Sequence, residues 1–123
     1  EYAAKGGADY KYAGSNEYNS VAWNQSNSNR RPHDVCTKAA NGYGLCDMNG
    51  NILEWVWDLY GEDYYAKSPE INPMGPSKGI NRIFRGGGWG EIELAGRVWT
   101  RMNISPYIRD KSLGFRLFRY TSN

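Results

Sequence analysis

The sequence has little of several features that particular protein classes need. Its 123 residues include one His, two Cys and no long apolar run. Nothing in it therefore predicts a membrane span, and a metal site built from several histidines is excluded. Runs of Val, Ile and Leu are also sparse, which argues against the buried parallel sheet of an α/β enzyme. The formal charge of +2 comes from Lys and Arg that are spread rather than clustered, so we expect no nucleic-acid partner.

Aromatic residues and glycine are abundant, because the chain has five Trp, ten Tyr and 15 Gly. Short aromatic runs separated by Gly and Asn predict turns and irregular backbone more than long helices. A chain of this length fits one domain, which we place at residues 1–123. A domain of this size buries a core without many disulfides.

Residues 1–7 carry a helix-end signal. Glu1-Tyr-Ala-Ala-Lys5, followed by Gly6 and Gly7, predicts the last turn of a helix with its glycine caps. Such a short helix does not nucleate alone. We therefore expect the natural protein to continue upstream in an N-terminal part that this chain lacks, and any targeting segment or anchor to lie there.

Three stretches predict β-strands. The clearest is 53–59, whose alternation gives one Trp-rich apolar face formed by Leu53, Trp55, Trp57 and Leu59. Residues 82–89 predict a short strand that enters a glycine run, and 113–118 predict a final strand. The polar stretch 15–31 predicts a long loop, which is ordered if Trp23 is buried.

Several phrases in a fixed order resemble the formylglycine-generating-enzyme (sulfatase-modifying factor) family. They include Gly42-Tyr-Gly-Leu45, Asp47-Met-Asn-Gly-Asn-Ile-Leu-Glu-Trp55, Arg85-Gly-Gly-Gly-Trp89 and Leu113-Gly-Phe-Arg-Leu117. The resemblance implies an α+β fold of the C-type-lectin-like type, with short antiparallel strands and long loops. The family contains enzymes and non-enzymes, so the fold alone does not decide the function.

The catalytic cysteines of the resembled enzymes have no counterpart in this chain. Those enzymes oxidise a cysteine in a sulfatase with a cysteine pair and copper, and the pair lies between the Arg-Gly-Gly and Gly-Phe-Arg phrases. The corresponding interval here, Arg85 to Arg116, contains no Cys. A soft thiolate ligand for copper is therefore missing, and we predict a protein that is not an enzyme and has no catalytic residue.

The two cysteines of this chain lie outside that interval. Cys36 and Cys46 occupy places where the resembled sequences more often have Gly and Tyr. Because both positions differ from the resembled sequences and both carry Cys, the two residues are expected to form a disulfide. A disulfide implies an oxidising compartment. The alternative is two free buried thiols in a cytosolic protein.

Residues 85–117 resemble more specifically the variable proteins that diversity-generating retroelements modify. In those proteins a fixed frame surrounds positions that differ from copy to copy, and the resemblance implies that 85–117 is a variable ligand-binding region. Ten positions between the frame residues can be reached from an Asn codon by changing its adenines: Gly90, Ile92, Thr100, Asn103, Ile104, Ser105, Tyr107, Ile108, Asp110 and Ser112. Five others cannot be reached in this way and must come from other template codons: Glu91, Glu93, Trp99, Met102 and Lys111.

The variable positions predict an apolar contact patch. Ile92, Ile104, Tyr107 and Ile108 are expected to be exposed next to Trp99, with a polar rim. Such patches mark interaction sites, and Tyr and Trp are favoured anchors. The alternative is that these residues are core and loop filler in an ordinary family member.

The segment 47–54 matches a family segment that binds calcium. The resemblance implies carboxylate ligands from Asp47 and Glu54, and backbone carbonyls from Gly50 and Ile52. The alternative is that the two carboxylates cap the turn or pair with a frame arginine: Arg85, Arg97 or Arg116. Calcium is thus a candidate structural ion, and no cofactor is required. The single His33 is expected to be a solvent-exposed loop residue.

Together these observations predict a monomeric ligand-binding domain outside the cell or on a bacterial cell surface, anchored through its N-terminal part. The ligand is a protein or a glycan, and this domain does not insert into a membrane. Two alternatives stay open: a fixed-sequence binding or structural module of the same fold, and a metal-dependent thiol oxidase that uses metal near Cys36 and Cys46.

Overall fold

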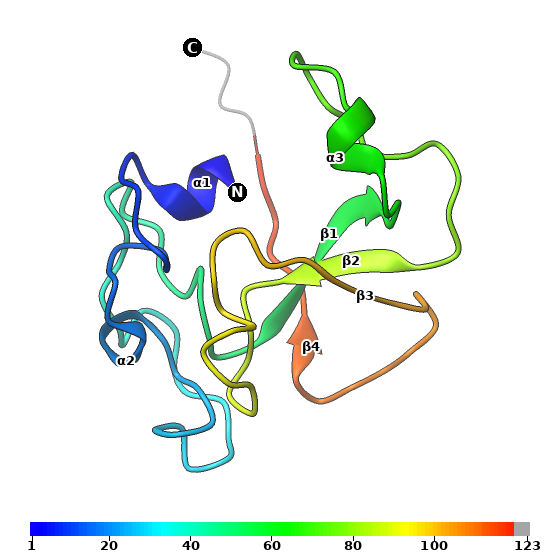
Figure 1. Cartoon of the computed structure of the whole chain (residues 1–123). Coiled ribbons are helices and arrows are strands. Elements are labelled where there is room, and N and C mark those ends of the chain that lie inside the picture. Colours follow the sequence, from blue (N-terminus) through cyan, green and yellow to red (C-terminus); the bar gives the residue numbers. More distant parts are fainter. Residues whose placement is uncertain (120–123) are drawn as a thin grey trace.

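The chain folds into a small sheet with short helices and long loops (Figure 1). The computed structural model describes residues 1–119, so the last four residues of the predicted domain lie outside the described part. The helices are α1 (Tyr2–Lys5), α2 (Tyr18–Val21) and α3 (Tyr64–Lys67). The strands are β1 (Leu53–Leu59), β2 (Arg82–Arg85), β3 (Met102–Ile104) and β4 (Leu113–Gly114). The α+β prediction with short elements and long loops is confirmed.

The four strands form one sheet in the order β3-β2-β1-β4. The pairs β1–β2 and β2–β3 are antiparallel, as predicted, whereas β1–β4 is parallel. The parallel pair arises because the chain leaves β3 at one edge and crosses to the opposite edge before it forms β4. This crossing places residues 105–112 in a connection that spans the sheet end (Figure 1).

The strand predictions are right in place and differ in length. The prediction for β1 is confirmed over its full range. β2 ends at Arg85 because Gly86 and Gly87 take left-handed φ angles of 91° and 69°, which end the extended conformation. The final strand was predicted over 113–118 but contains only Leu113–Gly114. Two residues after β4, the Arg116 side chain donates hydrogen bonds to Glu54 of β1. It also donates to the backbone carbonyls of Cys46 and Asp47 in the loop before β1.

The two faces of the sheet differ in what covers them. One face carries Ile83, which is 1% exposed, and Arg85, whose guanidinium contacts Val98 and Tyr65. We call this the closed face. The opposite face carries the Trp-rich side of β1, and we call it the open sheet face. Its residues are Trp55, Trp57, Phe84, Met102 and Leu113.

The N-terminal helix confirms the glycine-cap prediction. α1 ends at Lys5, and Gly6 forms the C-cap in the left-handed region with φ 60°. Ala4 of this helix packs in a buried cluster with Ala13 and Val98. None of the helices in the described part has the length and apolarity needed to cross a bilayer.

The stretch 15–31, predicted as a loop, contains the one-turn helix α2 and is otherwise ordered by an aromatic stack and by side-chain hydrogen bonds. Trp23 is half-buried, and its ring stacks on His33 with 3.8 Å between centroids. The prediction of an exposed His33 is therefore wrong: the ring is half-buried, and its Nε2 lies 2.7 Å from the Ser28 carbonyl oxygen. A histidine that follows a proline gives no sequence signal for a stacking partner ten positions away.

Buried asparagines connect this loop region to the rest of the domain. Asn49 accepts a hydrogen bond from the Ala13 amide and donates one to the Gly96 carbonyl. Asn51 exchanges two bonds with the backbone of His33. Because irregular backbone must find partners for its polar groups, these side chains replace the ladders that a larger sheet would supply. They also attach the interval after β2 to the N-terminal loops.

Candidate ligand-binding face and adjoining cleft

Arg85 positions the first part of the predicted variable region. Its Nη1 donates to the carbonyls of Val98 (3.0 Å) and Thr100 (3.4 Å). Its Nη2 donates to the Tyr65 hydroxyl at 2.7 Å and forms an ion pair with Glu1. The guanidinium thus holds the loop between β2 and β3 against the closed face. Arg85 acts here as a scaffold residue, and we do not place it on the contact surface.

A close approach of backbone and ring holds the same loop on its other side. A Cβ on Gly96 would lie 2.2 Å from the Tyr18 hydroxyl oxygen, so any side chain at this position would collide with the ring. Tyr18 itself is buried, and burial raises the pKa of its hydroxyl above the ordinary value. The loop 86–101 is therefore held in place by a glycine contact as well as by Arg85.

The predicted contact residues in this loop are Gly90, Ile92, Trp99 and Thr100. Ile92 is 56% exposed and Trp99 is 47% exposed. The Arg97 guanidinium lies 5.7 Å from the centre of the Trp99 ring. The Thr100 hydroxyl donates to the Leu94 carbonyl at 2.9 Å. Leu94 is itself exposed, although it is not among the predicted contact residues.

The remaining predicted contact residues lie on β3 and on the connection to β4. They are Asn103, Ile104, Ser105, Tyr107, Ile108, Asp110 and Ser112. Tyr107 is 90% exposed and Ile108 is exposed as well. Ile104 was expected to be exposed and is half-buried instead, because it lies in β3 opposite Arg82. Asn103 accepts a hydrogen bond from Asn81 at 2.7 Å, which occupies its carbonyl.

A local turn orders the end of this connection. Asp110 accepts hydrogen bonds from both the amide and the hydroxyl of Ser112. These two bonds lower the pKa of the Asp110 carboxyl below its ordinary value, because they favour the ionised form. The turn precedes β4, so it fixes where the exposed residues 107–108 leave the sheet.

The structure therefore places the predicted residues in two groups, 90–100 and 103–112. Among residues 1–119, no hydrogen bond or ring contact joins a predicted residue of the first group to one of the second. The exposed side chains are Ile92 and Trp99 in the first group, and Tyr107, Ile108 and Asp110 in the second.

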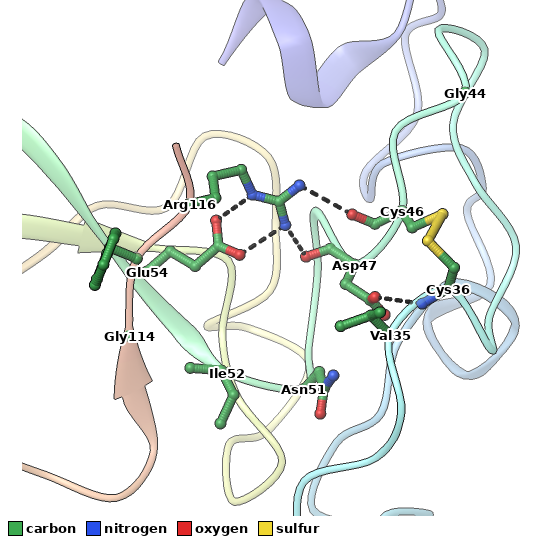
Figure 2. Close-up of a pocket in the computed structure, with 11 residues that line it drawn as sticks. Val35, Cys36, Gly44, Cys46, Asp47, Asn51, Ile52, Glu54, Gly114 and Arg116 are labelled. Atoms are coloured by element: carbon green, nitrogen blue, oxygen red, sulfur yellow. Dashed lines mark hydrogen bonds and ion pairs between the residues drawn. A yellow bond between two sulfur atoms is a disulfide. The ribbon is translucent and has the colours of Figure 1, made fainter. Parts of the chain in front are cut away.

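The candidate calcium segment is held by an arginine. Both oxygens of Glu54 accept hydrogen bonds from Arg116, each at 2.6 Å, and Figure 2 shows this two-point pair. The same guanidinium donates to the carbonyls of Cys46 (3.1 Å) and Asp47 (2.9 Å). The neighbouring carboxylate raises the pKa of Arg116 further above its ordinary value. The pairing of Glu54 with a frame arginine, left open by the sequence, is the arrangement observed.

This arrangement does not fit a calcium ion. The second carboxylate, Asp47, uses its Oδ2 to accept the Cys36 amide at 2.7 Å. Its Oδ1 is buried without a hydrogen-bond partner, which alone would favour a cation. However, each oxygen of Glu54 already accepts a hydrogen bond from Arg116, and this cationic guanidinium repels a second cation at the same carboxylate. Within the described part of the chain, no group of three or more His, Cys, Asp or Glu side chains could hold a metal.

A cleft of about 460 Å³ adjoins this ion pair. Its lining is mainly apolar and includes Val35, Ile52 and Phe115, with the disulfide on one side (Figure 2). Cys36 and Cys46 form the predicted bond, and both sulfurs are therefore used. No free cysteine exists among residues 1–119, so a thiol oxidase reaction at these residues would first require reduction of this bond.

Comparisons with known proteins agree with the fold. The family model described as "Sulfatase-modifying factor enzyme 1-like domain" matches residues 1–121. The formylglycine-generating enzyme of Streptomyces coelicolor is 34% identical over 134 residues, covering 94% of this chain and 43% of that enzyme. The serine/threonine-protein kinase pkn1 of Chlamydia pneumoniae is 40% identical over 85 residues, covering 67% of this chain and 14% of the kinase.

Solved structures extend this result. Treponema denticola variable protein 1 superposes with a TM-score of 0.82 and 37% identity, covering 93% of this chain and 42% of that one. PvdO from Pseudomonas aeruginosa superposes with a TM-score of 0.75 and 26% identity, covering 93% of this chain and 47% of that one. The chain thus spans less than half the length of these relatives. On this match over nearly all its residues, the chain belongs to the sulfatase-modifying factor enzyme 1-like family, whose members include formylglycine-generating enzymes.

Proposed function

We propose that this domain is a non-catalytic ligand-binding module whose contact residues lie in the interval 85–117. The observation that carries the proposal is the exposure of Ile92 and Trp99 on a loop that Arg85 holds in place, and of Tyr107 and Ile108 just before the Asp110–Ser112 turn. Exposed aromatic and aliphatic side chains on a rigid support are typical of interaction sites. We further propose that the domain is monomeric and that its ligand is a protein or a glycan.

The proposal includes sequence diversification by a retroelement. It is supported by the similarity to a Treponema variable protein and by the adenine-accessible positions between the frame residues. A fold held by hydrogen bonds and glycine contacts tolerates surface changes, since exposed substitutions cost little stability. The disulfide supports a location outside the cytoplasm, on a bacterial surface or in the medium.

The DNA around the source gene tests the diversification directly. We expect a near-copy of the stretch that encodes residues 90–112, differing at adenines, beside a reverse transcriptase gene. If no such copy exists, variation is rejected and a fixed-sequence binding or structural module remains.

A display library tests the binding function without knowledge of the natural ligand. Codons for Ile92, Tyr107 and Ile108 are randomised, and the library is selected against hen lysozyme as a probe. We expect binders that survive competition with soluble lysozyme. A matched library at Ile71, Met74 and Ile80, which are exposed outside the proposed face, should yield none. Equal success of both libraries would contradict a dedicated contact face.

The rival function is metal-dependent oxidation of a thiol. A peptide with a sulfatase-type cysteine motif is incubated with the domain, copper and air, and the aldehyde product is sought by mass spectrometry. We expect no product, because the interval 85–116 offers no cysteine and the existing pair is a disulfide. Aldehyde that depends on Cys36 or Cys46 would overturn the non-catalytic assignment.

A further inference from the structure

A further cavity lies where α1, β1 and the loop after β2 meet. Its volume is about 370 Å³, and its lining is largely apolar. Five charged residues also line it: Glu1, Glu54, Arg85, Arg97 and Arg116. None of the predicted contact residues belongs to this lining, so a ligand bound here would be separate from the proposed contact function. Concave, mainly apolar sites with a few polar groups are typical of small-molecule binding.

Two of the three arginines in this lining already have carboxylate partners. Arg116 holds both oxygens of Glu54, in the pair that Figure 2 shows. Arg85 forms an ion pair with Glu1 at 3.4 Å and also donates to two backbone carbonyls. The third guanidinium, that of Arg97, therefore leaves the side chains of the lining with one positive charge in excess.

The Arg97 side chain is half-buried, and within residues 1–119 it makes no hydrogen bond and no ion pair. Its Nε is buried without a partner. The Trp99 ring, whose centre lies 5.7 Å from the guanidinium, gives a cation–π contact but supplies no oxygen acceptor. Removing a charged group from water without a partner costs free energy. An anion that accepts hydrogen bonds from the guanidinium would offset this cost.

The backbone that carries Arg97 is fixed by hydrogen bonds of the domain itself. On its C-terminal side, the Val98 amide donates to the Lys11 carbonyl at 2.9 Å. The Arg97 carbonyl accepts from the Thr100 amide, also at 2.9 Å. The guanidinium therefore lies on a preorganised support, and preorganisation lowers the free-energy cost of binding a ligand.

We propose that this cavity binds a small organic acid, with its carboxylate on the Arg97 guanidinium and its apolar body against Trp55 and Val98. A planar guanidinium matches a carboxylate through two parallel hydrogen bonds. One positive charge in excess suits one negative charge on the ligand. The second charge of a phosphate would instead be repelled by Glu1 and Glu54, which line the same cavity. The ligand class is therefore a carboxylate with a single charge and an apolar body.

NMR titration of the chain 1–123 tests the proposal, with benzoate as the probe and neutral benzamide as the control ligand. At roughly 10 mM, which suits a ligand this small, benzoate should shift the side-chain Nε–H signal of Arg97 in a saturable way. Benzamide, and sodium chloride at the same ionic strength, should leave this signal in place. An Arg97 signal that benzoate does not move would overturn the proposal, as would equal shifts with benzamide.

Substitutions give an independent readout. Arg97→Gln should weaken benzoate binding about tenfold or more, because a charge-assisted pair is lost. The melting temperature without ligand should stay nearly unchanged, since the side chain has no hydrogen-bond or ion-pair partner to lose within residues 1–119. Arg109→Gln is the matched control, because Arg109 is exposed and does not line the cavity, and it should change neither quantity.

Three results of these measurements would contradict the site. Equal loss of benzoate binding in both variants would mean that only general charge attracts the ligand. A lowered melting temperature of Arg97→Gln with unchanged benzoate binding would make Arg97 a structural residue. Tighter binding of phenyl phosphate than of benzoate would overturn the carboxylate assignment. If Arg97→Gln does not fold, the Arg97 signal in the natural sequence decides the question without a variant.

Discussion

Two loop regions of this domain show opposite relations between composition and burial. Residues 22–41, which we call the polar loop, bury Asn24 (3% exposed) and Ser28 (0% exposed). Residues 86–112, which we call the binding loops after the function proposed above, expose Ile92 and Tyr107. Apolar side chains are usually inside and amides outside, so these residues reverse the common pattern, whereas Ala22 and Val98 in the same regions follow it. The comparison shows that side-chain hydropathy alone does not decide burial here.

The reason lies in the backbone of the polar loop. Irregular backbone buried against other chain needs partners for its N–H and C=O groups. Asn24 supplies them, because its side chain accepts from the Ser26 amide (2.9 Å) and donates to Asn19 (2.8 Å). Ser28 donates to the Trp89 carbonyl at 2.7 Å and so connects the polar loop to the binding loops. The amides thus fill a structural role, whereas Ile92 and Tyr107 of the binding loops remain exposed.

Loss of the disulfide is the strongest expected way to disrupt the polar loop. The double change Cys36→Ser and Cys46→Ser should lower the free energy of unfolding by about 2–3 kcal/mol, since the bond closes a short loop. The two cysteines are ten positions apart and lie beside the Asp47 and Arg116 contacts. Urea unfolding followed by tryptophan fluorescence measures the change. An unfolding midpoint that dithiothreitol leaves unaltered in the natural sequence would contradict this prediction.

Removal of a buried amide should have the next largest effect. Asn24→Ala leaves buried polar partners without hydrogen bonds and should cost about 2 kcal/mol in unfolding free energy. Gln25→Ala is the control, because Gln25 is the exposed neighbour, and its cost should stay below about 0.5 kcal/mol. Urea denaturation of both variants gives the comparison. Similar costs would mean that the polar loop is not held by its buried asparagine.

Changes in the binding loops should affect stability little. The double change Tyr107→Ser and Ile108→Ser should alter unfolding free energy by less than about 0.5 kcal/mol, because both side chains are exposed. The same change should abolish binding in clones selected from the Ile92, Tyr107 and Ile108 library. A large loss of stability would show that these residues belong to the core, and the comparison between the two loop regions would fail.

The smallest expected effect concerns a single titration. Ser112→Ala removes one of the two bonds that lower the Asp110 pKa, so that pKa should rise towards its ordinary value. Because the pKa of Asp110 is lower in the folded state than in the unfolded state, the ionised carboxyl stabilises the fold at pH values above the unfolded-state pKa. This stabilisation is lost as the pH falls through the folded-state pKa. The side chain is exposed, so the effect on unfolding is small. NMR titration measures the pKa of Asp110 in the natural sequence and in the Ser112→Ala variant. An unchanged pKa would show that the Ser112 hydroxyl does not cause the lowering.

Local signals in the sequence were sufficient for several elements. Glycine after Lys5 predicted the end of α1, and alternation predicted β1 over its full range. The family phrases predicted the fold, and the unusual cysteine pair predicted the disulfide. Each of these features depends on residues that are neighbours in the sequence, or on a motif that occurs with the same local structure in similar proteins.

Contacts between distant residues were beyond these signals. Glu54 pairs with Arg116, 62 positions away, so a segment that resembles a calcium site holds a guanidinium instead. His33 stacks on Trp23, and Ile104 lies half-buried in β3, although both were predicted to be exposed. The residue types that an Asn codon can reach mark positions in the binding loops, but they contain nothing about which side chains the sheet covers.

By itself, then, the sequence determined the fold type, the turns, the place of β1 and the cysteine pairing, because these follow from short-range backbone preferences and motif order. The tertiary structure alone decided which face of the sheet is closed, which arginine takes Glu54, and how the contact residues divide into two groups. The physical reason is that burial and charge pairing depend on chain segments that meet only after folding.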